Sequence, residues 1–214
     1  MNLAELIFYG AELAGTAAFA ISGAMTAIER KLDLFGVLLL SVITALGGGV
    51  TRDLLLGHIP PRMFERYEYV LIAVLCGLAV FLVARCSKER YQRHMPRIST
   101  INNVFDAIGL GVFSAIGVQA AIQAGFEQNW FFAITLGMLT GVGGGILRDM
   151  MSQSLPAVLH KHIYAVAAIA GAGCYYVIYR LGINQKIAMA ASVLLTFAIR
   201  ILATRYEWSL PKAE

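Results

Sequence analysis

The 214-residue chain is 58% apolar and only 14% charged, and its mean hydropathy is +0.70. Soluble globular domains contain about 45–50% apolar and about 25% charged residues, so this composition excludes an ordinary soluble protein and predicts an integral membrane protein. The formal net charge of +4 is small and mostly flanks apolar stretches, so the sequence gives no support for nucleic-acid binding.

Apolar segments long enough to cross a hydrocarbon core of about 30 Å recur along the chain. They are Leu3–Ile28, Leu34–Gly57, Tyr69–Ala84, Ile101–Ala124, Trp130–Met151, Ile163–Tyr179 and Ile187–Thr204. The first lacks a basic region before it and is expected to be retained rather than cleaved. Because the polar links are short, we predict one all-α membrane domain over residues 1–214, with seven transmembrane helices.

Lysine and arginine are concentrated on one side of this seven-helix layout. That side contains the links after the first, third and fifth segments and the C-terminal tail, including Arg200 and Arg205. The positive-inside rule therefore predicts an external N-terminus and a cytoplasmic C-terminus in the inner (plasma) membrane. The longest basic link, Arg85–Arg97, is expected to set this topology, and binding of anionic lipid headgroups is its alternative role.

A motif of three glycines followed by Arg-Asp occurs twice. "LGGGVTRDLLLG" covers Leu46–Gly57, and "TGVGGGILRDMM" covers Thr140–Met151. Upstream of these motifs, Glu12 aligns with Asp106. Each unit contains three spans, so consecutive copies must enter the membrane from opposite sides, which is an inverted-topology repeat. We predict repeat 1 at about 3–85, repeat 2 at about 98–180, and a seventh helix at about 187–204 that belongs to neither.

Glycine is a poor helix former, costing about 1 kcal/mol relative to alanine at each interior position. We therefore predict that helices 2 and 5 are broken at Gly47–Gly49 and Gly143–Gly145. Carbonyl groups freed by a break would suit a cation, whereas the N–H groups of a second half-helix would suit a carboxylate. Close packing of helices through small residues is the alternative explanation.

Four charged residues, Arg52, Asp53, Arg148 and Asp149, fall within the predicted spans. Ionisable side chains at membrane depth are functional candidates, and both locking of the helices and direct contact with an ion remain open. Adjacent helical residues point about 100° apart, so we expect pairing between the repeats rather than within one Arg-Asp motif. Glu12 and Asp106 are expected to attract cations or to meet an arginine.

The two glycine motifs, the 3+3+1 plan and the length resemble the trimeric intracellular cation (TRIC) channel family, prokaryotic branch, whose bacterial members are also called glycine-transporter-domain proteins. The resemblance implies a homotrimer with a pore in each protomer, kinked helices 2 and 5, and passage of monovalent cations, chiefly K⁺. It assigns the ion pathway to Gly47, Gly48, Gly49, Gly143, Gly144 and Gly145, with the four motif charges beside them. K⁺ would contact the backbone of Gly47, Gly48, Gly143 and Gly144.

Other functions stay open at this point. Inverted repeats also serve secondary transporters, so transport of a small zwitterion such as glycine is the main alternative. A structural scaffold that uses its glycines only for packing is the third. The sequence contains no nucleophile elbow, P-loop or metal-ligand cluster. We therefore expect neither an enzyme nor a cofactor, and only permeant K⁺ or Na⁺ and membrane lipids as ligands.

Overall fold

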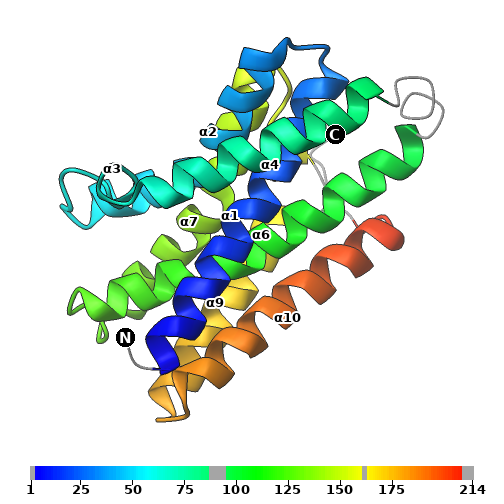
Figure 1. Cartoon of the computed structure of the whole chain (residues 1–214). Coiled ribbons are helices and arrows are strands. Elements are labelled where there is room, and N and C mark those ends of the chain that lie inside the picture. Colours follow the sequence, from blue (N-terminus) through cyan, green and yellow to red (C-terminus); the bar gives the residue numbers. More distant parts are fainter. Residues whose placement is uncertain (1–2, 87–94, 161–162, 209–214) are drawn as a thin grey trace.

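The computed structural model describes residues 3–86, 95–160 and 163–208. Within these ranges the chain is all-α and contains no β-strand, as predicted (Figure 1). The helices are α1 (Leu3–Glu29), α2 (Leu34–Leu55), α3 (Arg62–Glu65), α4 (Tyr67–Cys86), α6 (Met95–Gln123), α7 (Trp130–Met151), α8 (Ala157–His160), α9 (Tyr164–Arg180) and α10 (Gln185–Arg205). Most of the basic Arg85–Arg97 link, residues 87–94, lies outside the described residues.

Each predicted span corresponds to one long helix. Six of them, α1, α2, α4, α6, α7 and α10, are long and apolar enough to cross a membrane. The remaining one, α9, has 17 residues and is about 25 Å long at 1.5 Å per residue, somewhat less than a typical hydrocarbon core. The all-α membrane fold is thus confirmed with six spans and a shorter seventh helix.

Helix α6 is the centre of the bundle. It packs against α1, α7, α9 and α10, and 83% of its most apolar stretch is buried inside the protein (Figure 1). In contrast, α4 packs mainly against α1 and α2 and is only 22% buried over the corresponding stretch. Leucines at positions 71, 75 and 82 of α4 are exposed, which suits a helix whose outer face meets lipid or another protein.

The predicted breaks in helices 2 and 5 are wrong. Helix α2 continues without interruption through Gly47–Gly49, and α7 continues through Gly143–Gly145. Each helix has 22 residues and is about 33 Å long, so neither needs a second half-helix to cross the membrane. Packing between α2 and α7 overrides the low helix propensity of the glycines.

The α2–α7 crossing explains why glycine is needed. A Cβ atom on Gly48 would overlap the carbonyl oxygen of Thr140, and one on Gly144 would overlap that of Thr44. Both threonine hydroxyls donate to the carbonyl four residues earlier in their own helices, at 2.6 Å. The alternative explanation, close packing through small residues, is therefore confirmed at these positions.

Helix α6 begins at Met95 rather than at the predicted Ile101. The residues added at this end include the polar Ser99 and Thr100. These residues line a cavity inside the bundle, so the helix continues past the apolar segment because its polar side chains face that cavity. Hydropathy alone could not reveal this extension.

Candidate functional site

Helices α2 and α7 end in the same way, directly after their Arg-Asp pairs. In α2 the N–H of His58 donates to the Asp53 carbonyl, and Gly57 has a φ of 73°. In α7 the N–H of Ser154 donates to the Asp149 carbonyl, and Gln153 has a φ of 54°. Both are Schellman-type endings, which turn the chain back over the last helical turn. A short helix then follows in each unit, α3 or α8, which sequence analysis did not predict.

The Asp53 carboxylate connects α2 to this returning chain. Its Oδ1 atom accepts a hydrogen bond of 2.9 Å from Arg52 Nε, and its Oδ2 atom accepts one of 3.0 Å from the Arg62 N–H at the start of α3. Arg52 Nη1 also lies 3.8 Å from Glu12 Oε1 on α1. Glu12 in turn accepts a hydrogen bond of 2.7 Å from the Tyr69 hydroxyl on α4.

The second unit repeats this arrangement with shorter contacts. Asp149 Oδ1 accepts a hydrogen bond of 2.9 Å from Arg148 Nε, and its Oδ2 atom accepts one of 2.7 Å from the Ala157 N–H at the start of α8. Arg148 Nη1 lies 2.7 Å from Asp106 Oδ1 and donates to the Ser22 hydroxyl at 2.8 Å. Asp106 thus meets the arginine of its own unit, as Glu12 does.

The predicted pairing between repeats is therefore wrong for the charged groups. Arg52 binds Asp53 and Arg148 binds Asp149, although neighbouring helical side chains point about 100° apart. The arginine side chain is long enough to fold back to its neighbour, while the second aspartate oxygen turns toward the incoming short helix. Among the described residues, the hydrogen bonds from Arg148 to Ser22 and from Asn102 to Thr26 join the two units here.

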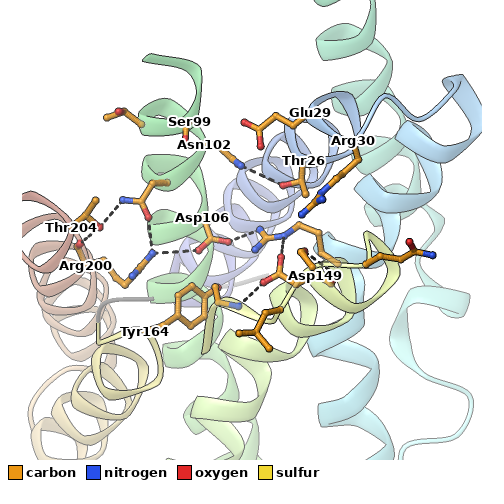
Figure 2. Close-up of a pocket in the computed structure, with 17 residues that line it drawn as sticks. Thr26, Glu29, Arg30, Ser99, Asn102, Asp106, Asp149, Tyr164, Arg200 and Thr204 are labelled. Atoms are coloured by element: carbon orange, nitrogen blue, oxygen red, sulfur yellow. Dashed lines mark hydrogen bonds and ion pairs between the residues drawn. The ribbon is translucent and has the colours of Figure 1, made fainter. Parts of the chain in front are cut away.

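A third arginine joins the second cluster and was missed as a site residue. Arg200 of α10 is only 2% exposed, and its Nη2 atom donates to Asn103 Oδ1 at 2.6 Å (Figure 2). The same atom lies 3.9 Å from Asp106 Oδ2, and the guanidinium lies 4.6 Å from the centre of the Tyr164 ring. The positive-inside count places Arg200 among the charges that flank the last span. Its position within the apolar run "FAIRILA" was the available signal.

Each arginine–carboxylate cluster borders a cavity. The first cluster is Arg52, Asp53 and Glu12, and the second is Arg148, Asp149 and Asp106. The larger cavity, of about 670 Å³, is lined by polar groups of α1, α6, α7, α9 and α10 (Figure 2). The charged residues among its described lining are Glu29, Arg30, Asp106, Arg148, Asp149 and Arg200. The smaller cavity, of about 30 Å³, is lined by Glu12, Arg52, Asp53, Arg62 and Tyr69, together with less polar side chains.

Helix α1 passes both cavities, and this places them at opposite ends of the bundle. Thr16 lines the smaller cavity, whereas Thr26, about 15 Å further along the helix, lines the larger one. The two lining sets share no residue. Phe113 of α6, which lines the smaller cavity, stacks on Phe19 of α1 with 5.4 Å between ring centres.

The predicted glycines divide into two groups. Gly47 and Gly48 of α2 face Gly143 and Gly144 of α7. A Cβ atom added at Gly48, Gly143 or Gly144 would meet the backbone of the facing helix, and one added at Gly47 would meet the Leu147 side chain. Gly49 instead lines the smaller cavity. On α7, a Cβ atom at position 145 would approach the Tyr164 hydroxyl at 2.8 Å, beside the larger cavity.

The Tyr69–Glu12 hydrogen bond leads to a prediction about stability. We expect Tyr69→Phe to lower the free energy of unfolding by about 1.5–3 kcal/mol, the usual worth of a hydrogen bond to a charged group. Tyr9→Phe is the matched control, because the Tyr9 hydroxyl lies 3.4 Å from Glu68, at the limit of a hydrogen bond. Thermal unfolding in detergent measures both variants. Equal losses in the two would contradict a specific role for Tyr69.

The fold and the site define an α-helical membrane protein with a buried arginine–carboxylate cluster and a cavity at each end of its bundle. A family model described as glycine transporter matches residues 9–85 and again 103–180. The chain belongs to the prokaryotic branch of the TRIC cation channel family, which this domain defines. Such channels are not enzymes, so the prediction that the chain is not an enzyme is confirmed.

The relatives are similar over almost the whole chain. The chain is 36% identical to a UPF0126 membrane protein of Vibrio cholerae, over 96% of this chain and 82% of the relative. It is 35% identical to the inner membrane protein YadS of Escherichia coli K12, over 96% of both. A prokaryotic TRIC channel solved in 0.5 M KCl has a TM-score of 0.84 at 31% identity, over 96% of this chain and all of the other. A structure solved in a study of conductance through TRIC cation channels has a TM-score of 0.83 at 36% identity, over 97% of this chain and 98% of the other.

Proposed function

We propose that this protein is a K⁺-permeable channel for monovalent cations that works as a homotrimer with a pore in each protomer. The observation that carries the proposal is the pair of cavities at opposite ends of one bundle, each bordered by buried carboxylates. Solved relatives of similar length are described as TRIC channels, which supports the same function and the trimer.

Arginine beside a cation pathway is an apparent difficulty, because a guanidinium repels K⁺. The ion pairs remove it. Arg52 is offset by Asp53 and Glu12, and Arg148 is offset by Asp149 and Asp106. Arg52 and Arg148 therefore each have two carboxylates near them, and these two arginines do not oppose a cation.

The carboxylates are better candidates for contact with the permeant cation than the glycine carbonyls. In a continuous helix the carbonyls of Gly47, Gly48, Gly143 and Gly144 belong to the helical hydrogen-bond ladder, and Gly47 also accepts a hydrogen bond from Thr51. Glu12 is the most accessible acidic group of the smaller cavity, with 20% of its side chain exposed. We therefore assign the first cation contact in the smaller cavity to Glu12.

The α2–α7 crossing is the proposed barrier between the cavities. Glycine backbones of the two helices touch there. A path between the cavities therefore needs these helices to separate at Gly48 and Gly144. Glycines permit such a movement because they leave no interlocking side chains at the contact.

The proposed topology has two inverted three-helix repeats and one additional helix. The equivalent contacts of Asp53 and Asp149, and the two family matches, support the repeats. Residence in the inner membrane is supported by the similarity to an inner membrane protein of E. coli. The positive-inside rule supports an external N-terminus, with the larger cavity opening to the cytoplasm.

Planar-bilayer recording of the purified protein tests the proposal. In a KCl gradient we expect unitary currents that reverse near the K⁺ equilibrium potential. In the fraction of the protein that folds, Gly48→Leu and Gly144→Leu should weaken these currents, because a leucine at the crossing blocks the path. Unitary currents that reverse near the Cl⁻ potential, or no currents from a folded protein, would overturn the proposal.

Transport of a small zwitterion is the second candidate. It is favoured by the larger cavity, whose lining presents guanidinium and carboxylate groups together, as the two ends of an amino acid require. The family domain also carries the description glycine transporter. Saturable uptake of glycine into liposomes, by a protein that is silent in the bilayer, would favour this candidate over the channel.

A further inference from the structure

Helix α10 is the one long helix that neither family match includes, since these end at residues 85 and 180. It is nevertheless packed closely on the second unit. The Ser192 hydroxyl donates to the Gly171 carbonyl at 2.7 Å, and a Cβ atom on Gly111 of α6 would meet the Val193 backbone at 3.0 Å. These contacts fix the rotation of α10 and direct Arg200 into the larger cavity.

Arg200 lies beside one particular oxygen atom. Asp106 Oδ1 is bound by Arg148 Nη1 at 2.7 Å. Asp106 Oδ2 lies 3.9 Å from Arg200 Nη2, beyond hydrogen-bond distance but within ion-pair range (Figure 2). The Asn103 amide oxygen and the Tyr164 ring also contact the Arg200 guanidinium.

Among the described residues that line the larger cavity, the charges balance only if Arg200 is included. The guanidiniums of Arg30, Arg148 and Arg200 offset the carboxylates of Glu29, Asp106 and Asp149. Without Arg200 these described lining residues have one excess negative charge, and Asp106 loses one of its two arginine neighbours. A carboxylate with excess negative charge around it attracts a small cation.

We propose that Arg200 is a selectivity-determining residue for cation flow, because its guanidinium takes the position beside Asp106 Oδ2 that a permeant cation would otherwise occupy. The inference rests on the proposed channel function. Arg200 acts as a tethered cation that limits the K⁺ concentration in the larger cavity. The smaller cavity borders no residue of α10, so the restriction applies at one end of the pathway only.

Single-channel recording of Arg200→Gln tests this role. Glutamine keeps a polar side chain near Asn103 but removes the charge. A unit charge at about 4 Å in water changes a local ion concentration about fivefold, so we expect the K⁺ current in 0.1 M KCl to rise about two- to fivefold. In 1 M KCl the Debye length falls from about 10 Å to about 3 Å, and the difference from wild type should largely disappear.

Three variants complete the experiment. Arg200→Lys keeps the charge and should conduct like wild type. Arg205→Gln removes an exposed arginine one turn later on α10 and should also leave the current unchanged. Asn103→Asp adds a carboxylate beside an intact Arg200, so it should raise the current as Arg200→Gln does, which gives an independent route if Arg200→Gln does not fold.

The inference is overturned if neither charge-altering variant raises the current in 0.1 M KCl, or if the change is the same in 1 M KCl. If wild type carries no current, the channel function fails, and cation binding decides the role of Arg200. Thermal unfolding is then compared in KCl and in N-methyl-D-glucamine chloride of equal ionic strength. Arg200→Gln should show K⁺-specific stabilisation at a severalfold lower concentration than wild type, and equal midpoints would refute the inference.

Discussion

Adding a single methyl group to Gly48 or Gly144 is expected to destabilise the protein strongly. In either Gly48→Ala or Gly144→Ala, the new Cβ atom meets a backbone carbonyl of the facing helix, and a backbone cannot rotate away as a side chain can. Overpacking of this kind costs about 1–3 kcal/mol and sometimes more, which outweighs the gain of about 1 kcal/mol in helix propensity. Thermal unfolding in detergent, together with the K⁺ conductance of the folded fraction, measures the effect.

Gly49→Ala is the matched control within the same motif. The nearest atom to a Cβ at this position is a guanidinium nitrogen of Arg52 at 3.8 Å, an ordinary contact distance. A second control is Gly173→Ala on α9, where no atom lies within 4 Å of the added group. Both should be neutral or slightly stabilising. If Gly48→Ala were as stable as Gly49→Ala, the tight α2–α7 crossing would be incorrect.

The sequence predicted the fold well because hydropathy and repetition are properties of the chain itself. Every apolar segment became a helix, and α7 has the predicted bounds, Trp130–Met151. The alignment of Glu12 with Asp106 also predicted equivalent places for two carboxylates, and each lies near the arginine of its own unit. Residue type and spacing were sufficient for these predictions.

The predictions that failed depend on tertiary contacts. A glycine triplet signals either a break or a close approach, and only the position of the facing helix distinguishes them. Likewise, the partner of Asp53 is partly the N–H of Arg62, which comes within reach because the chain reverses after α2. Arg200 resembled a flanking charge because nothing in its local sequence reveals that Asn103 and Asp106 of α6 lie opposite it.

The second large effect is expected from the motif aspartates, which either lock the helices together or bind the permeant ion. Asp53 and Arg52 are each only 2% exposed, and both oxygens of Asp53 already accept hydrogen bonds from Arg52 and Arg62. Because both carboxylate oxygens of Asp53 already have partners, a role in locking the helices is favoured over direct contact with an ion. Asp53→Asn leaves the Arg52 guanidinium buried without its principal partner, so we expect a loss of about 3–5 kcal/mol in stability together with lower cation conductance.

The double variant Arg52→Gln, Asp53→Asn separates the two roles. If Asp53 is a lock, removing both charges eliminates the unpaired buried ion, and stability and conductance should recover together. Asp33→Asn at the exposed start of α2 is the control, because asparagine caps a helix about as well as aspartate and should change neither quantity. A double variant that folds like wild type but still fails to conduct would show that the Asp53 carboxylate itself contacts the permeant cation.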